Sequence, residues 1–111
     1  MYLLQTINER KMEVRFESSP REVATMNTAA LCENFLVQGL MKPDEISLVY
    51  THYDRVIIGG VMPTGAAIVL PCHEELKADY FLERRELGII NLGGRGHVLT
   101  DEGSYHVDKL G

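Results

Sequence analysis

The sequence has few basic residues and no long apolar run. It holds 11 Lys and Arg residues against 16 Asp and Glu residues, which gives a formal net charge of −5. Because the basic residues form no stripe, a partner with a phosphate backbone, such as a nucleic acid, is not expected. The longest apolar stretches, Val56–Met62 and Ala66–Leu70, are far too short to span a bilayer, so no membrane partner is expected either.

Cysteine is scarce as well, and the beginning of the chain is not typical of an export signal. Cys32 and Cys72 show no CxxC spacing, which favours free thiols in a reducing, cytoplasmic compartment. The first residues, MYLLQTINERK, lack a cleavage-like small-residue site. We expect residues 1–11 to form a loosely attached extension ahead of a domain that begins at Met12.

What the chain does have is enough apolar residues, 45% of 111, for the core of one small domain. A helix start is marked by Ser19 as N-cap, Pro20 at the first helical position and Glu22 as the partner of a capping box. A second short helix is predicted over Thr28–Asn34, with Leu31 and Phe35 facing inward. Both are too short to be stable alone and must pack on another element.

The rest of the chain is mainly strand-like. RVIIGGVM is apolar on both faces, as in a strand inside a sheet, and Gly59 and Gly60 within it indicate a bulge or a close backbone approach. Strands so short and frequent predict an antiparallel sandwich or barrel. We expect roughly six of them, in the segments EISLVYTH, RVIIGGVM, AAIVL, ELGIINLG, RGHVLT and SYHVD.

Four histidines, His52, His73, His97 and His106, raise the question of a metal site. His97 and His106 flank the turn Asp101–Gly103. A three-residue loop ending on a left-handed Gly103 would pair His97 with Val107 and His106 with Val98, and would place the two imidazoles on opposite faces. A two-residue turn would put both on one face, but we expect it to be disfavoured because it would need a positive φ at Glu102. No shared metal ion is predicted.

Two other clusters contain carboxylates. Cys72-His73-Glu74 resembles a ligand set, but it reads better as the start of a helical turn after Pro71. Glu86 shares the apolar face of ELGIINL with Gly88, Ile90 and Leu92. A carboxylate on an inward face must be paired, so we predict a structural Arg84–Glu86 ion pair, with a pocket-lining Glu86 as the alternative.

Two blocks carry a family resemblance. The segments NFLVQGLMKPDEISLVYTHYDRVIIGGVMP and DYFLERRELGIINLGGRG resemble the 5-keto-4-deoxyuronate isomerases, also called 4-deoxy-L-threo-5-hexosulose-uronate ketol-isomerases. The resemblance covers nearly the whole chain from Met12 to Gly111. It implies a double-cupin protein, and for this chain an antiparallel cupin-like (jelly-roll) barrel, incomplete, with one or two short N-terminal helices. Residues 12–111 would be the N-terminal cupin-like domain, truncated before the barrel closes.

The same resemblance implies a function. Members of the family convert 4-deoxy-L-threo-5-hexosulose uronate to 3-deoxy-D-glycero-2,5-hexodiulosonate in pectin degradation, use zinc, and assemble into homo-oligomers, usually hexamers. Glu86 and Gly93 fit the cupin spacing of Glu, six residues and Gly, but the positions before Glu86 hold no histidine. The zinc ligands are therefore expected outside this chain, with none bound here.

For an acidic sugar substrate, the plausible contacts in this chain are arginines. Arg55, Arg84 and Arg85, together with Glu86, are the candidate substrate-binding or interface residues, and a structural role is favoured for each arginine. The chain is thus read as the scaffold and oligomerisation part of an isomerase, with its catalytic residues unknown. The alternative is a non-catalytic cupin-like binding or assembly module.

Overall fold

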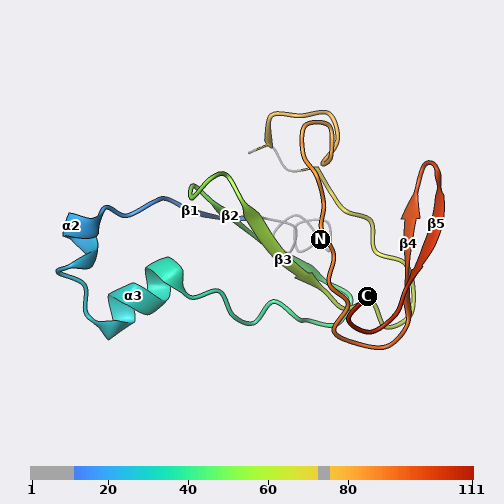
Figure 1. Ribbon diagram of the computed structural model, residues 1–111, viewed down its shortest axis with the longest axis horizontal. Coiled ribbons are helices and arrows are strands. Elements are labelled where there is room, and N and C mark those ends of the chain that lie inside the picture. The colour runs from blue at the N-terminus through green and yellow to red at the C-terminus, as the bar shows by residue number, and fades with distance from the viewer. Residues whose placement is uncertain (1–11, 73–75) are drawn as a thin grey trace, which may run out of the picture. The chain divides into compact units, whose positions relative to one another are not determined.

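The computed structural model describes residues 12–72 and 76–111. Within them the element order is β1 (Glu13–Arg15), α2 (Pro20–Val23), α3 (Thr28–Phe35), β2 (Ile46–Thr51), β3 (Ile57–Val61), β4 (Gly96–Thr100) and β5 (Gly103–Val107) (Figure 1). The chain divides into two compact units, Met1–Phe81 and Leu82–Gly111. The fold is mainly β, as predicted, with two short helices and two small sheets, and these sheets form no closed barrel in the described residues.

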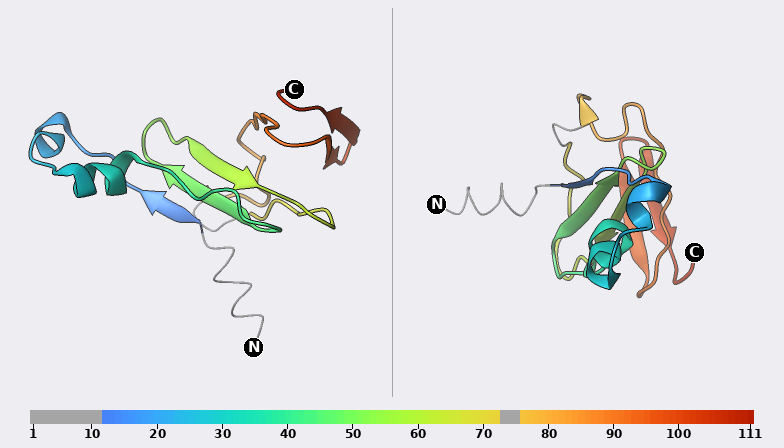
Figure 2. Two further views of the ribbon diagram at one scale, coloured as in Figure 1. Left: turned by 90° about the horizontal axis from the view of Figure 1, so that it is seen from below. Right: turned by 90° about the vertical axis from the view of Figure 1, so that its left-hand side faces the viewer.

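The first unit is built on a three-stranded sheet in the order β1-β2-β3 (Figure 2). β2, the central strand, has the β-branched and aromatic composition ISLVYT that favours a pleated, partly buried surface. It pairs antiparallel with β3 and parallel with β1, whose Glu13 lies opposite Val49. An antiparallel sheet was predicted, so the parallel β1–β2 pair is a difference. The chain can place β1 parallel to β2 because the long connection between them, which contains α2 and α3, crosses back to the same end of the sheet.

The two helices begin where the sequence predicts. Ser19 caps α2: its hydroxyl accepts a hydrogen bond from the backbone N–H of Glu22, and the Glu22 carboxylate accepts one from the N–H of Ser19. Asn27 caps α3 by accepting from the N–H of Ala30. Leu31 and Phe35 are not buried as the inward-facing prediction implies, because both are more than a third exposed, although the Phe35 ring lies against Tyr53.

Close backbone approach explains one glycine of β3. A Cβ on Gly60 would lie 2.7 Å from the Cβ of Leu40 and 2.8 Å from its carbonyl oxygen. The segment before β2 therefore packs directly on the backbone of β3, and this contact needs a glycine. Of the two predicted alternatives, a bulge or a close backbone approach, the close backbone approach is confirmed at Gly60.

Two predicted strands are not found. AAIVL and ELGIINLG have no strand pairing, and their apolar side chains are largely exposed, including Val69 at 83% and Ile90 at 73%. Alternation of apolar residues describes a face, but a strand also needs a neighbouring strand to accept and donate its backbone hydrogen bonds. In the described residues neither segment has one.

The second unit contains the β4–β5 hairpin. Its base is fixed by Asn91, whose side-chain amide donates to the carbonyl oxygens of Gly94 and Val107, both at 2.8 Å. The backbone carbonyl of Asn91 also accepts from the N–H of Leu110 at 2.6 Å. One side chain thus joins the glycine-rich bend to the far end of β5.

No helix in the described residues is long and apolar enough to cross a membrane.

Hydrogen bonds between Asp44 and Thr64 join the segment before β2 to the segment after β3. The Thr64 hydroxyl donates to Asp44 Oδ2 at 2.5 Å, and the Thr64 N–H donates to Asp44 Oδ1 at 2.8 Å. These two bonds, the hydroxyl first, hold the pKa of Asp44 below its usual value because they favour the charged carboxylate.

We therefore expect Thr64→Val to raise the pKa of Asp44, and Thr64→Ser to leave it low. A depressed pKa adds stability that is complete above the unfolded-state pKa, about 3.9, and is lost as the pH falls through the folded value. A carboxyl-carbon NMR titration measures the pKa of Asp44 in both variants. An Asp44 pKa unchanged in Thr64→Val would contradict the assignment.

Candidate functional site

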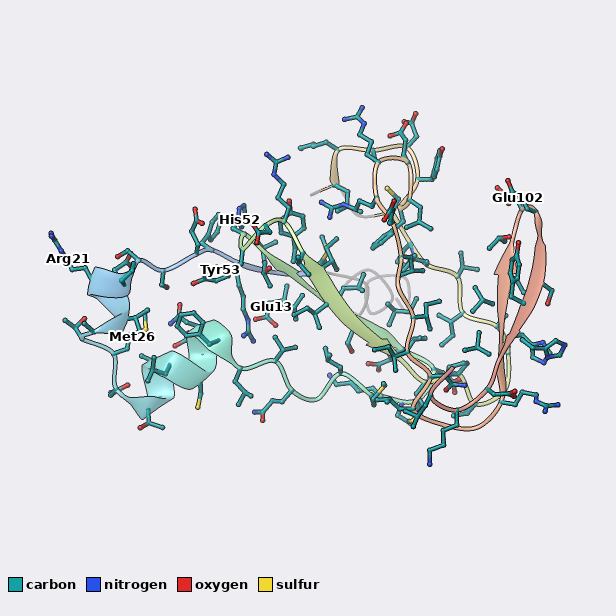
Figure 3. All side chains as sticks on the ribbon, viewed as in Figure 1. Glu13, Arg21, Met26, His52, Tyr53 and Glu102 are labelled. Carbon is teal, nitrogen blue, oxygen red and sulfur yellow. The ribbon has the colours of Figure 1, made fainter. Side chains whose placement is uncertain are left out.

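A shallow, largely apolar pocket lies in the first unit, between α3, β1 and the β2–β3 hairpin. Its volume is about 360 Å³. The apolar part of the wall comes from Phe35, Val37, Val56 and Ile58, and the remaining lining residues are Arg15, Asn34, Thr51, Tyr53 and Asp54. Figure 3 shows Tyr53 and Glu13 near this end of the sheet.

Arg15 and Tyr53, two polar residues of the pocket lining, already hold elements together. Arg15, with a side chain only 17% exposed, donates to Glu13 Oε1 at 2.7 Å and to the carbonyl of Leu36 at 2.6 Å. The Tyr53 hydroxyl accepts from the N–H of Ser18 at 2.8 Å, and its ring lies against Phe35 at 5.9 Å. The pocket offers apolar contact, but it shows no paired acid and base of the kind that proton transfer requires.

Arg55 lies in the turn beside this pocket but does not line it. The backbones of Asp54 and Arg55 are both left-handed, with φ of 54° and 56°, and the N–H of Val56 donates to the carbonyl of Tyr53 at 3.3 Å. This is the geometry of a type I′ hairpin turn, which normally favours Asn-Gly. A non-glycine residue held there is strained, so the conformation of Arg55 is imposed by the β2–β3 pairing.

Arg84, Arg85 and Glu86 lie in the second unit, at and after a turn that follows Phe81. The predicted Arg84–Glu86 ion pair is not formed. Arg84 instead approaches Glu83, Nε to Oε2 at 3.9 Å, with a side chain that is 75% exposed. Such an exposed pair contributes little to stability.

The inward face predicted for Glu86 is also wrong. Glu86 is exposed, and its segment is not a strand, so the alternation that would aim it at a core does not apply. A pocket-lining Glu86 is therefore not supported in the second unit. Arg55 belongs to the other unit, and the role of all four candidate residues stays a prediction.

The register predicted for the β4–β5 hairpin, with His97 opposite Val107, is wrong. His97 lies directly opposite His106, and the loop has two residues, Asp101 and Glu102, between Thr100 and Gly103. Neither Glu102 nor Gly103 has a positive φ. The Thr100 hydroxyl accepts hydrogen bonds from the N–H groups of Glu102 and Gly103, both at 3.2 Å, and this stabilises the short turn without a left-handed residue.

As a consequence the two imidazoles share a face, with ring centroids 4.3 Å apart. His52 is elsewhere, stacked on Phe16 at 4.6 Å. The Cys72-His73-Glu74 cluster lies partly outside the described residues. Among residues 12–72 and 76–111, no three His, Cys, Asp or Glu side chains gather to hold a metal ion. The described part of the chain therefore does not supply the three protein ligands of a catalytic zinc site.

Two features of these sites were not predicted from the sequence. Asn91 follows two isoleucines in an apolar segment, and only its bonds across the hairpin base reveal its role. Arg15 lies in β1, a strand of three residues without any readable period. An asparagine in an apolar run was the one available signal, since a polar amide there needs partners.

Comparison with known proteins finds curated relatives with a common name, 4-deoxy-L-threo-5-hexosulose-uronate ketol-isomerase. The relative from Halalkalibacterium halodurans is 47% identical over 98 residues, which are 88% of this chain and 36% of the relative. The relative from Caldicellulosiruptor bescii is 45% identical over the same shares. That from Formosa agariphila is 48% identical over 97 residues, 87% of this chain and 35% of the relative.

These matches confirm the resemblance read from the sequence. They fall in the N-terminal portion of the relatives, and the chain spans about a third of the relatives' length. No family model matches the chain.

Proposed function

We propose that this chain is the N-terminal part of a ketol-isomerase that acts on 4-deoxy-L-threo-5-hexosulose uronate, and that it contributes scaffold and assembly surface to that enzyme. The observation that carries the proposal is the 44–48% identity to proteins of that name over most of the chain. The product would be 3-deoxy-D-glycero-2,5-hexodiulosonate, formed by moving a proton between adjacent carbons through an enediol.

The local chemistry supports a scaffold role for these residues. An enediol isomerisation needs a group that moves a proton and a group that stabilises the developing oxyanion. The described pocket has its arginine and tyrosine engaged in structural hydrogen bonds, and the described residues hold no cluster of three metal ligands. We place the zinc ligands of the isomerase, and its catalytic groups, in the part of the relatives' length that this chain does not cover.

The finer features of the proposal follow the resemblance. We propose an N-terminal cupin domain whose barrel is completed by residues beyond this chain, a homo-oligomer, usually a hexamer in the family, and a cytoplasmic location. Cys32 and Cys72 are free and exposed, which suits a reducing compartment. The many exposed apolar side chains of the described residues, such as Ile90 and Leu92, suit a surface that other parts of a larger protein cover.

Substitution in the full-length gene product distinguishes scaffold from substrate contact. Arg55→Ala, Arg84→Ala, Arg85→Ala and Glu86→Gln should each lower kcat/KM by less than about tenfold, which is about 1.4 kcal/mol. A charge-assisted hydrogen bond to the substrate carboxylate contributes about 1.5–3 kcal/mol, so its loss would cost roughly ten- to a hundredfold.

Arg95→Ala is the matched control. Arg95 is an exposed arginine of the unit that also holds Arg84 and Arg85, and it is paired with Asp108 at 2.9 Å. A candidate arginine whose loss costs about tenfold or more beyond the loss of Arg95 would be a substrate contact, and the scaffold role would fail for it. If the full-length protein shows no isomerase activity at all, the alternative of a non-catalytic cupin-like binding or assembly module takes its place.

A further inference from the structure

His97 and His106 form an exposed pair of imidazoles on the β4–β5 hairpin. They lie directly opposite each other in the strand register, their ring centroids are 4.3 Å apart, and their planes are inclined by 57°. In the described residues neither ring takes part in a hydrogen bond or an ion pair. Both rings are therefore free to reorient about their side-chain bonds while the strands hold their Cα atoms in place.

The position of the pair is fixed by the hairpin and does not depend on the first unit. The two-residue turn between Thr100 and Gly103 sets the strand register, and in this register His97 lies opposite His106 on the same face of the hairpin. Strand alternation puts Leu99 and Ser104 on the face of the histidines. Figure 3 marks the tip of this hairpin by Glu102.

The chemistry of two adjacent imidazoles suits a transition-metal ion. Imidazole nitrogen is a common ligand of Zn²⁺, Cu²⁺ and Ni²⁺. Zinc–nitrogen bonds of about 2.0–2.1 Å place two nitrogens on a tetrahedral ion roughly 3.3 Å apart. Rings whose centroids are 4.3 Å apart can present one nitrogen each at such a spacing. Water would complete the coordination, since the pair is exposed.

The surrounding charge does not oppose a cation. Between Gly96 and Val107 the hairpin has no Lys or Arg, and its turn carries Asp101 and Glu102. The nearest cation along β4 is Arg95, whose charge is compensated by Asp108 at 2.9 Å. Within the hairpin, therefore, no Lys or Arg needs to be displaced for an ion to bind.

We propose that His97 and His106 chelate one divalent first-row transition-metal ion on the face of the β4–β5 hairpin. This site is separate from the zinc site that the family resemblance implies, and it does not depend on isomerase activity. It also replaces the expectation that these two histidines cannot share an ion, which rested on the wrong hairpin register.

Titration calorimetry of the chelator-stripped 111-residue chain with Cu²⁺, Ni²⁺ and Mg²⁺ salts tests the site, in a Cys32→Ser/Cys72→Ser background because the two exposed thiols would otherwise bind and reduce Cu²⁺. We expect one Cu²⁺ per chain, bound more tightly than Ni²⁺ as the order of divalent affinities requires, and no heat from Mg²⁺, which prefers oxygen ligands. His97→Gln and His106→Gln should each weaken Cu²⁺ binding by about tenfold or more. The double variant should lose little beyond either single variant, because a chelate needs both rings.

His52→Gln and His73→Gln are the controls, and both should leave Cu²⁺ binding unchanged. Circular dichroism of each variant checks that the fold is retained, and the spin-resonance spectrum of bound Cu²⁺ reports its nitrogen ligands directly. The proposal is overturned if the two single variants each lose half of the bound Cu²⁺ additively, as independent surface histidines would, or if His73→Gln abolishes the site.

Discussion

The 111-residue chain, purified alone, should sediment as a dimer or larger assembly at micromolar concentrations. Among the described residues only Met12, Val49 and Phe81 are buried apolar side chains, whereas Val69, Ile90 and Leu92 are 60–83% exposed. Each half-exposed Ile or Leu forfeits on the order of 1 kcal/mol of burial. Over the exposed set this is comparable to the whole stability of a small domain, roughly 5–15 kcal/mol.

The sheets add a second reason for association. In the order β1-β2-β3 the outer strands are paired on one side only within the described residues, and unpaired strand edges accept strands from other chains. Sedimentation velocity over a range of concentrations measures the assembly. Ile90→Lys together with Leu92→Lys should shift the distribution toward monomer, whereas Ser104→Lys, at an exposed polar position, should not. A clean monomer with a sharp unfolding transition would count against the argument.

Gly60→Ala should be the most destabilising single-methyl change in the first unit. The new methyl group would meet the backbone of Leu40 as well as its Cβ, at 2.7–3.0 Å. Backbone atoms cannot rotate away as the end of a side chain can, so β3 or the segment before β2 must shift. Overpacking of this kind typically costs about 1–3 kcal/mol.

Two other glycines provide graded controls for that variant. Gly59→Ala would meet the Cδ2 atom of Leu48 at 2.5 Å, which is the end of a flexible side chain, and the carbonyl oxygen of Ser47 at 3.1 Å. Its backbone contact is looser than that at Gly60, so the cost should be smaller. Gly65→Ala has nothing within 4 Å and should be nearly neutral. Urea midpoints should fall in the order Gly65→Ala, Gly59→Ala, Gly60→Ala. Equal midpoints for Gly60→Ala and Gly65→Ala would show that the contact with Leu40 is not formed in solution.

Local signals in the sequence predict local structure well in this chain. The capping box of Ser19 and Glu22 needs only neighbouring residues, and it forms as read. Four of the predicted strand segments form strands that have a partner: β2, β3, β4 and β5. The apolar segment 86–92 has the same alternation but no partner in the described residues, which is why its pattern misleads and why Glu86 is exposed.

The histidine pair His97 and His106 was harder to predict because its geometry depends on the register of the β4–β5 hairpin. A loop of two residues in place of three brings His97 and His106 to one face, and hydrogen bonds to the hydroxyl of Thr100 stabilise the shorter loop. Propensity rules favoured a left-handed glycine and gave no weight to this side chain. The pairing of β1 with β2 likewise joins residues more than thirty positions apart in the sequence. The period of a short segment does not indicate which distant strand it pairs with.

The rate of conversion of 4-deoxy-L-threo-5-hexosulose uronate, measured for the full-length gene product and for the 111-residue chain under the same conditions with zinc added, tests the central proposal most directly. A scaffold role predicts turnover by the full-length protein and none above buffer by the chain. Metal-dependent turnover by these 111 residues alone would place the active site within them and would contradict the proposal.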